Sequence, residues 1–316
     1  EFLMEDATYW IDELNLDGYR LDAVKHVRPD FWWRFRTRIR DTFPNNNFYL
    51  VGETFQSRQG IADFVGPNML DGQFDFPLYD VIIPCFAQTQ LGFDELESAL
   101  RESEEVYGRS VRMSALLGNH DKSRFIAFAD GDLPDPSDSD DEEVGWSKII
   151  RVDNASAYKK LKLAMTFLLS IDGVPMIYYG DEIGMSGAGD PDNRRMMRFG
   201  KDVTEEETAT KAHFTKLAKT RTEHPSLYLG SRRVLVAEED HYAYVRKHED
   251  DVSLVVFNRT EEMQRYVLEL APEVSDIVLI DALSDAEITV CNGRVVLEVG
   301  AMESAVFVSS NGVNAH

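Results

Sequence analysis

The stretch Asp17-Gly18-Tyr19-Arg20-Leu21-Asp22-Ala23-Val24-Lys25-His26 decides how this chain is interpreted. Its middle, residues 19–24, has the composition of a short β-strand. Four ionisable side chains stand in or directly after it: Arg20, Asp22, Lys25 and His26. Charge inside a β-type segment conflicts with simple burial, and such conflicts are typical of functional sites. A solvated strand with a fortuitous ion pair has the same pattern, so other parts of the chain must decide.

Two further apolar segments also run into acidic residues at their carboxyl ends. Residues 48–53 predict a short strand that ends in Glu53, and residues 111–118 predict a strand followed by Asn119-His120-Asp121. Asp22, Glu53 and Asp121 therefore follow three successive predicted strands. The carboxyl ends of parallel strands share one edge, so these three carboxylates are expected to converge.

Helical and strand patterns alternate over the first 225 residues. Amphipathic periodicity predicts helices at 29–42, 92–107, 155–170 and 204–223, the last with a capping box formed by Thr204 and Glu207. Short strands are also predicted at 71–76 and 174–179. This α/β pattern favours a partial (β/α)8 barrel over a doubly wound sheet, because no Gly-rich phosphate fingerprint follows any strand.

The pattern changes after His224-Pro225. Short runs of alternating apolar and polar residues follow up to residue 308, and Asn292-Gly293 between two of them predicts a hairpin. We therefore expect two domains: a partial catalytic barrel at 1–225 and an antiparallel β-sandwich at 226–316.

The composition limits the class of ligand. The net charge is -23, from 33 Lys+Arg and 56 Asp+Glu. Nucleic acids and anionic membranes are unfavourable partners for such a chain, whereas neutral ligands are compatible with it.

The acidic loop at 130–143 is expected to be a solvated insertion, with a weak calcium site as the alternative. Cys85 and Cys291 form no disulfide framework, and we expect two buried thiols.

Two carboxylates in one cleft match the chemistry of glycoside hydrolysis. One serves as nucleophile or base, and the other, kept protonated, serves as acid. Arg20 projects to the same side of its strand as Asp22 and is suited to keeping it ionised. His120 is suited to donating a hydrogen bond to a sugar hydroxyl. For each of these residues taken alone, the alternative interpretation is an ion pair at the end of a strand, without a catalytic role.

These same residues resemble the α-amylase family of glycoside hydrolases (family 13). Residues 18–26 are similar to its second signature region, Gly52-Glu53 to its third, and Leu117-Gly118-Asn119-His120-Asp121 to its fourth. Gly173-Val174-Pro175 and the segment 178–182 resemble its eighth-strand region. The all-β tail is similar to the C-terminal domain of that family.

The resemblance implies a role for each residue. It makes Asp22 the nucleophile, Glu53 the acid/base and Asp121 the third carboxylate, which stabilises the transition state. Other residues are implied to bind substrate: Arg20, Lys25, His26, His120, Asp190 and Arg194. For Asp190 and Arg194, a surface ion pair is the alternative. Four aromatic residues are candidates for stacking on sugar rings or for the core: Phe55, Trp146, Tyr178 and Tyr179.

The sequence also departs from the family pattern. The family's first signature region and first three strands are not in it, so we expect the C-terminal portion of a longer enzyme. No cofactor is expected for the chemistry. The resemblance implies a structural calcium ion between the first signature region and the backbone near His26, and only the His26 part is present. The resemblance is compatible with secretion or a periplasmic location, but neither the compartment nor the oligomeric state is predicted.

The predicted function is retaining cleavage of α-glucosidic bonds in starch-like glucans or maltooligosaccharides. One rival is a transglycosylase or isomerase of the same family that handles cyclodextrins or trehalose. A rival of another class is a non-catalytic glycan-binding barrel. The presence of all three carboxylates disfavours this last rival, because binding alone does not require them.

Overall fold

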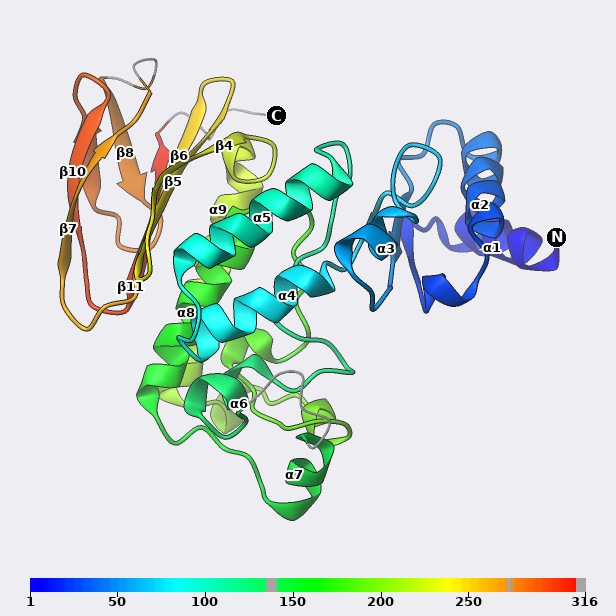
Figure 1. Cartoon of the computed structure of the whole chain (residues 1–316), viewed down its shortest axis with the longest axis horizontal. Coiled ribbons are helices and arrows are strands. Elements are labelled where there is room, and N and C mark those ends of the chain that lie inside the picture. Colours follow the sequence, from blue (N-terminus) through cyan, green and yellow to red (C-terminus); the bar gives the residue numbers. More distant parts are fainter. Residues whose placement is uncertain (135–140, 272–273, 275, 311–316) are drawn as a thin grey trace. The chain divides into compact units, whose positions relative to one another are not determined.

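The computed structural model describes residues 1–134, 141–271, 274 and 276–310 (Figure 1). Residues 135–140 of the acidic loop therefore lie outside the described residues. The chain divides into two compact units. Unit 1 comprises Glu1–Tyr79, Ala99–Leu116 and Gly173–Met176, and unit 2 comprises Asp80–Ser98, Leu117–Asp172 and Ile177–His316. Each unit is described by itself.

The elements follow one another with short connections. The α-helices are α1 (Phe2–Leu14), α2 (Pro29–Thr42), α3 (Arg58–Ala62), α4 (Phe76–Ile82), α5 (Phe93–Tyr107), α6 (Phe125–Asp130), α7 (Asp141–Ser147), α8 (Ala155–Ser170) and α9 (Glu205–Glu223). The tighter or wider helical turns are η1 (Val24–His26), η2 (Ile83–Ala87), η3 (Asp181–Ile183), η4 (Asp192–Arg194), η5 (Gly200–Asp202) and η6 (Pro225–Leu227). The strands are β1 (Gly18–Leu21), β2 (Tyr49–Gly52), β3 (Gly72–Gln73), β4 (Ser231–Ala237), β5 (His241–His248), β6 (Asp251–Asn258), β7 (Gln264–Glu269), β8 (Ile277–Asp281), β9 (Glu287–Val290), β10 (Arg294–Val299) and β11 (Glu303–Ser309).

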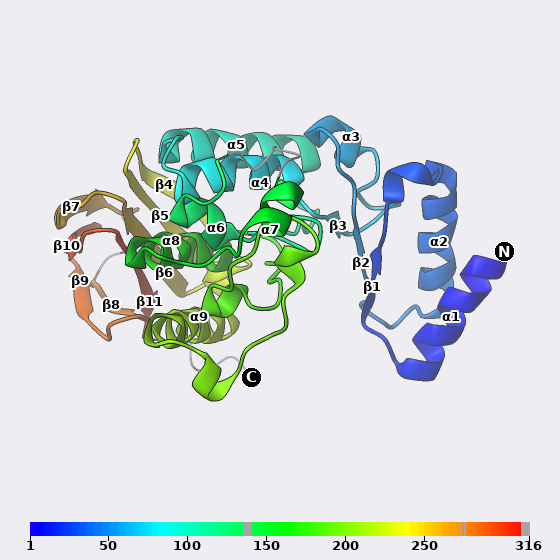
Figure 2. The ribbon, with the colours of Figure 1, turned by 90° about the horizontal axis from the view of Figure 1, so that it is seen from below.

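Unit 1 contains parallel strands in chain order. β1 pairs with β2 and β2 with β3, both in parallel, and the three strands lie side by side in Figure 2. Two parallel bridges continue the series, Phe74 with Ser114 and Leu116 with Met176. The predicted continuous strands at 111–118 and 174–179 are therefore wrong in length, because each of these segments pairs through single residues. The order and direction of the five segments are as expected for successive βα units.

Helix α2 forms as its sequence predicts. Pro29 occupies its first turn, where the missing N–H costs nothing. Its buried face places Trp32, Phe35 and Ile39 at helical spacing against Leu50 of β2. The Trp32 Nε1–H donates to the carbonyl of Val24 at 3.0 Å, which ties the helix to the turn after β1.

Gly72 permits the close approach of two segments of unit 1. A Cβ at this position would lie 1.9 Å from the carbonyl oxygen of Arg112 and 2.7 Å from the hydroxyl of Tyr49. Every other residue type would push the segment before Ser114 away from β3, so glycine is required by packing here.

Two helices of unit 2 match their predicted spans, whereas α6 and α7 were not predicted, and α7 begins with the buried Asp141 inside the predicted acidic loop. α8 has the predicted bounds, and the capping box at the start of α9 is confirmed by reciprocal hydrogen bonds between Thr204 and Glu207. No helix in the described part of the chain is long and apolar enough to span a bilayer.

The prediction of two buried thiols is half wrong: Cys85 is buried, but Cys291, which follows the short strand β9, is exposed.

Two antiparallel sheets form the C-terminal part of unit 2. One has the strand order β4-β5-β6-β11-β8-β9, and β10 pairs with β7 in the other. Figure 1 shows the β7–β10 pair on one side of the larger sheet and α8 and α9 on its other side. β7 and β10 alternate buried and exposed residues because only one of their faces meets the shared core, whereas β5 and β6 are almost fully buried.

The hairpin predicted at Asn292-Gly293 is confirmed. It joins β9 to β10, and Cys291 pairs with Arg294 across it. Asn292 and Gly293 have φ values of 51° and 71°, the left-handed conformation that a tight two-residue turn requires.

Asp251 fastens the end of α9 to the C-terminal sheets. Its carboxylate, 10% exposed, accepts hydrogen bonds from His224 Nδ1 at 2.9 Å, from the Ser226 N–H at 2.8 Å and from the Ser309 hydroxyl at 2.9 Å. Burial raises the pKa of Asp251, but these hydrogen bonds outweigh it and lower the pKa to about 2. The charged carboxylate therefore stabilises the folded chain.

Asp251→Asn is expected to lower the free energy of unfolding by about 2 kcal/mol at pH 7, because charged hydrogen bonds are lost. The pKa in the folded state is lower than the ordinary value of 3.8, so this stabilisation is complete above about pH 4 and disappears as the pH falls towards 2. Urea unfolding at several pH values measures it. The exposed neighbour Asp250→Asn is the control, with a change within about 0.5 kcal/mol. A pH-independent deficit in Asp251→Asn would contradict the assignment.

Candidate active site

Asp22 and Glu53 emerge from adjacent strands of unit 1. Leu21 at the end of β1 pairs with Gly52 at the end of β2, so the next residue of each strand is one of the two carboxylates. The Glu53 N–H donates to the Leu21 carbonyl, and the Val24 N–H donates to the Glu53 carbonyl, both at 2.9 Å. The backbone therefore holds the two residues in register.

Arg20 bridges the two carboxylates. Its Nη1 pairs with Asp22 Oδ1, and its Nη2 lies 3.0 Å from Glu53 Oε1. The side chains differ in environment: that of Asp22 is 70% exposed and that of Glu53 is 7% exposed. Arg20 therefore joins an exposed and a buried carboxylate at the ends of two neighbouring strands.

Ala23 supplies a third contact to this pair. Its N–H donates to Glu53 Oε2 at 3.3 Å. Its φ of 48° lies in the left-handed region, which costs a non-glycine residue roughly 1–2 kcal/mol. Ala23 carries no side-chain signal, so the sequence analysis missed it. Its strained backbone turns the chain directly after Asp22.

Lys25 and His26 lie in η1, the single turn that follows. Lys25 Nζ donates to the carbonyl of Phe55 at 3.0 Å, which links this turn to the segment after Glu53. His26 is exposed. Within residues 1–134, 141–271, 274 and 276–310, no three His, Cys, Asp or Glu side chains group in a way that could hold a metal. A calcium ion takes six to eight oxygen ligands, and the backbone of His26 offers one of them, so the structural calcium ion stays a prediction.

The predicted residues of unit 2 form a second group. The Asn119 side chain accepts the Asp121 N–H at 2.9 Å and shapes the turn. His120 Nε2 lies 3.2 Å from Asp121 Oδ2. Arg194 Nη2 lies 3.4 Å from Asp121 Oδ1 and 3.1 Å from Asp190 Oδ2. Arg194 therefore bridges two carboxylates, as Arg20 does in unit 1.

The 190–195 loop is fastened to this turn through backbone groups as well. Arg194 Nε donates to the His120 carbonyl at 2.9 Å. The buried Asn193 donates from Nδ2 to the carbonyls of His120 and Lys122 at 2.8 Å and 2.9 Å. Asp190 and Arg194 are therefore more than an isolated surface ion pair, since they belong to a loop that clamps the His120-Asp121 turn.

Arg124 is a residue that the sequence analysis missed. It is only 1% exposed. Its Nε donates to the Asn193 carbonyl at 2.8 Å, and its Nη1 donates to the Tyr179 carbonyl at 2.6 Å and to Asp181 Oδ1 at 3.0 Å. The guanidinium also lies 4.1 Å from the centre of the Tyr178 ring. Its position five residues after Asn119 was the only signal in the sequence.

Asp181 depends on Arg124 for its charge. Burial raises the pKa of Asp181 to about 6, against the opposing effect of the Arg124 guanidinium. The buried pair joins the turn after Asp121 to η3. Removing one partner of such a pair leaves a buried charge without compensation.

The other candidate aromatic residues have different environments. Phe55 stacks on Phe76 with ring centres 3.7 Å apart, and Tyr178 contacts Arg124, so both have packing roles. Tyr179 is 39% exposed, and its hydroxyl donates to the Arg195 carbonyl at 3.0 Å. Trp146 is 73% exposed, so it is not a core residue.

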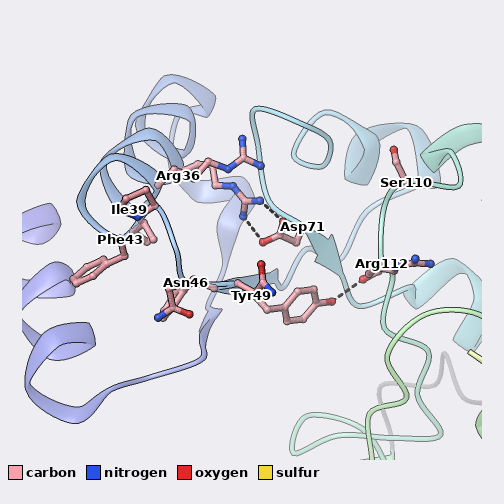
Figure 3. Close-up of a pocket in the computed structure, with 12 residues that line it drawn as sticks. Arg36, Ile39, Phe43, Asn46, Tyr49, Asp71, Ser110 and Arg112 are labelled. Atoms are coloured by element: carbon pink, nitrogen blue, oxygen red, sulfur yellow. Dashed lines mark hydrogen bonds and ion pairs between the residues drawn. The ribbon is translucent and has the colours of Figure 1, made fainter. Parts of the chain in front are cut away.

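A pocket of about 490 Å³ lies at the opposite end of the strands of unit 1. Tyr49 at the start of β2 and Asp71 just before β3 line it, and Figure 3 shows Arg36 reaching Asp71 and the Tyr49 hydroxyl reaching Arg112. Asp71 also accepts the Leu50 N–H at 2.8 Å. These contacts join α2 to the strands, so we assign this pocket a structural role, apart from Asp22 and Glu53.

The predicted site residues thus form two groups, one in each unit. Unit 1 brings together Arg20, Asp22, Lys25 and Glu53. Unit 2 brings together His120, Asp121, Asp190 and Arg194. The roles implied for these residues stay predictions.

Two family descriptions match the chain. "Alpha amylase, catalytic domain" matches residues 2–228, and "Maltogenic Amylase, C-terminal domain" matches residues 232–306. The first covers more than half of the chain and contains both groups of candidate residues. The boundary predicted at residue 225 stays a prediction.

Named proteins are similar over most of this chain. An amylopullulanase of Thermoanaerobacter thermohydrosulfuricus is 30% identical over 98% of the chain and 22% of its own length. A cyclomaltodextrinase of Geobacillus thermopakistaniensis is 28% identical over 83% of the chain and 40% of its own length. The structure of an α-amylase from Geobacillus thermoleovorans complexed with acarbose matches with a TM-score of 0.80 and 28% identity, over 98% of this chain and 63% of that one. The chain thus spans well under half the length of these two curated relatives.

Arg124→Met is expected to lower the free energy of unfolding by about 3–5 kcal/mol at pH 8, because Asp181 is left charged and buried. A buried carboxylate with a raised pKa destabilises the folded state at pH values above that pKa, where it is charged. The stability recovers as the pH falls through the pKa and the carboxylate becomes protonated. The deficit should therefore shrink from pH 8 to pH 5, as measured by urea unfolding. Arg28→Met, which removes an exposed pair with Asp30, is the control. Equal deficits at both pH values would refute the role of the Asp181 charge.

Proposed function

This chain belongs to the α-amylase family of glycoside hydrolases, and on that basis we propose that it cleaves α-glucosidic bonds of starch-like glucans with retention of configuration. The observation that carries the proposal is the pair Asp22 and Glu53, set in register on adjacent strands and bridged by Arg20. A non-catalytic glycan-binding barrel would not require this pair of carboxylates in different environments.

In the first proposed step, a carboxylate oxygen of Asp22 attacks the anomeric carbon of the bound sugar. The bond from that carbon to the glycosidic oxygen breaks, and Glu53 gives its proton to the leaving oxygen. The product is a covalent glycosyl ester on Asp22. The exposed position of Asp22 supports access to a substrate, and its ion pair with Arg20 holds the carboxylate in place.

In the second step, Glu53, now ionised, takes a proton from a water molecule. The water oxygen attacks the anomeric carbon, the ester bond to Asp22 breaks, and the carboxylate is restored. Two displacements at one carbon return the original configuration. The Arg20 and Ala23 contacts support this role, because they fix Glu53 through both of its oxygens.

The second group of residues would hold the sugar. We assign Asp121 to hydroxyl groups of the reacting sugar, with His120 as a hydrogen-bond donor beside it. Arg194 and Asp190 would hold the next sugar on the donor side. These assignments are supported by the hydrogen bond and the ion pairs that fasten the 190–195 loop to the His120-Asp121 turn.

We further propose that the parallel segments of unit 1 are strands four to eight of a (β/α)8 barrel. The support is their chain order, β1, β2, β3, the segment at Ser114 and the segment at Met176, each paired in parallel with the one before it. In such barrels the chemistry lies at the carboxyl ends of the strands, where Asp22 and Glu53 are.

The proposed substrates are neutral α-glucans, including linear and cyclic maltooligosaccharides. The names of relatives, cyclomaltodextrinase and maltogenic α-amylase, describe action on this class by those proteins. A net charge of -23 suits an uncharged substrate.

Glu53→Gln and Asp22→Asn are each expected to lower kcat on a maltooligosaccharide by at least about 10²–10⁴-fold, because each removes a group that acts in the transition state. The assay uses the enzyme that contains this chain. Asp30→Asn is a matched control, since this carboxylate lies on α2 in a solvent-exposed pair. Turnover near the parental rate in either variant would refute the assignment.

The anomer of the first product tests retention separately. Proton NMR of a fresh digest should show the α-anomer before mutarotation, because two displacements preserve configuration. A β-anomer as first product would refute the double displacement. Chromatography of the same digest separates hydrolysis from transfer to a second sugar.

A further inference from the structure

Unit 2 carries four large apolar side chains that are largely exposed to solvent on two short segments. Trp146, Ile149, Met196 and Phe199 are 73%, 72%, 87% and 67% exposed, respectively. We call these four residues the apolar rim. Single exposed apolar residues are ordinary, but a group of this kind commonly marks a binding surface.

The two segments of the apolar rim are fastened to each other. Arg195 Nη1 donates to the Ile150 carbonyl at 2.7 Å. The chain neighbours of these two residues, Ile149 and Met196, are members of the rim, so the hydrogen bond joins the two segments that carry them. Arg195 is itself fixed by two bonds to Asp192, at 2.8 Å and 2.7 Å.

Trp146 is connected to the same loop. Its neighbour Gly145 packs so closely that a Cβ there would lie 2.9 Å from the Cβ of Asp192. The Asp141 carbonyl at the start of α7 accepts the Gly189 N–H at 3.1 Å, and the Asp141 carboxylate accepts the Ser123 hydroxyl at 2.6 Å. Helix α7 is thereby anchored to both the 187–192 loop and the turn after Asp121.

Phe199 is held outward by its neighbour. Arg198 binds the buried Glu207 of α9, with Nη1 3.0 Å from Oε2. Arg195 and Arg198 are thus tied to carboxylates of the protein, whereas Met196, which lies between them, and Phe199, which follows them, remain exposed.

We propose that the apolar rim binds the glucose units of an α-glucan chain that extend beyond the sugar held by Asp190 and Arg194. This rests on the proposed function. Gly145 packs against Asp192 of η4, and Arg195, the residue after Arg194, binds the Ile150 carbonyl, so both rim segments are joined to the loop that carries Asp190 and Arg194. A glucose ring presents apolar C–H faces, which an indole or phenyl ring can cover, and hydroxyl edges, which suit the nearby charged groups.

The charge of the protein favours this occupant over a second copy of the chain. Two molecules that each carry a net charge of -23 repel each other, whereas a neutral glucan does not meet this barrier.

The test measures binding of short and long ligands to the enzyme that contains this chain, made inactive by Glu53→Gln. By calorimetry, adding Trp146→Ala or Phe199→Ala should weaken maltoheptaose binding by about three- to tenfold, the effect of one lost ring contact. Maltose binding should change by less than about twofold, because maltose does not reach the rim. Trp33→Ala, an exposed tryptophan on α2, is the matched control and should leave both affinities unchanged.

Equal weakening for maltose and maltoheptaose, or no weakening for either, would overturn the proposal. A change in molecular mass on light scattering caused by Trp146→Ala would overturn it too, in favour of self-association. Turnover by the parental enzyme tests the proposed function independently. If turnover is present and the length dependence absent, the rim proposal fails alone; if turnover is absent and the length dependence present, only the proposed reaction fails.

Discussion

The parallel register between β1 and β2 is the constraint on which the candidate active site depends. Because Leu21 pairs with Gly52, the next residues of the two strands, Asp22 and Glu53, emerge side by side. Arg20 projects on the same side as Asp22, since strand side chains alternate, and it can therefore reach both carboxylates. A slip by one residue would turn each of these side chains to the other face and separate the group.

The parts of the structure that follow local periodicity could be predicted from the sequence. Helix α2 with Pro29 in its first turn and the Asn292-Gly293 hairpin were predicted because their signals lie within a few residues. The neighbouring positions of Asp22 and Glu53 could be predicted because each residue directly follows a strand signal. Arg124 and the strained Ala23 were not, since their importance comes from contacts with segments far away in sequence. The pairing of residues 111–118 was overestimated for the same reason, because strand length depends on the neighbouring segment.

Arginine is the residue that organises the loops of unit 2. The guanidinium of Arg124 reaches two segments at once, the 190–195 loop and residues 179–181, because its donors form a planar fork that suits carbonyl and carboxylate oxygens in different directions. Lysine offers a single point charge and could not make the same set of contacts. Arg194 and Arg195 repeat this use in the next loop. A chain with many more carboxylates than cations thus fixes its loops through a few arginines.

This arrangement also determines what the carboxylates can bind. Clustered carboxylates without a partner attract cations, because their mutual repulsion is relieved by positive charge. Here Arg20 lies between Asp22 and Glu53, and Arg194 lies between Asp121 and Asp190. Each pair is therefore partly neutralised while lone pairs on its oxygens remain for hydrogen bonding. Such groups present acceptors and donors side by side at low net charge, which is the pattern that a neutral ligand rich in hydroxyl groups requires.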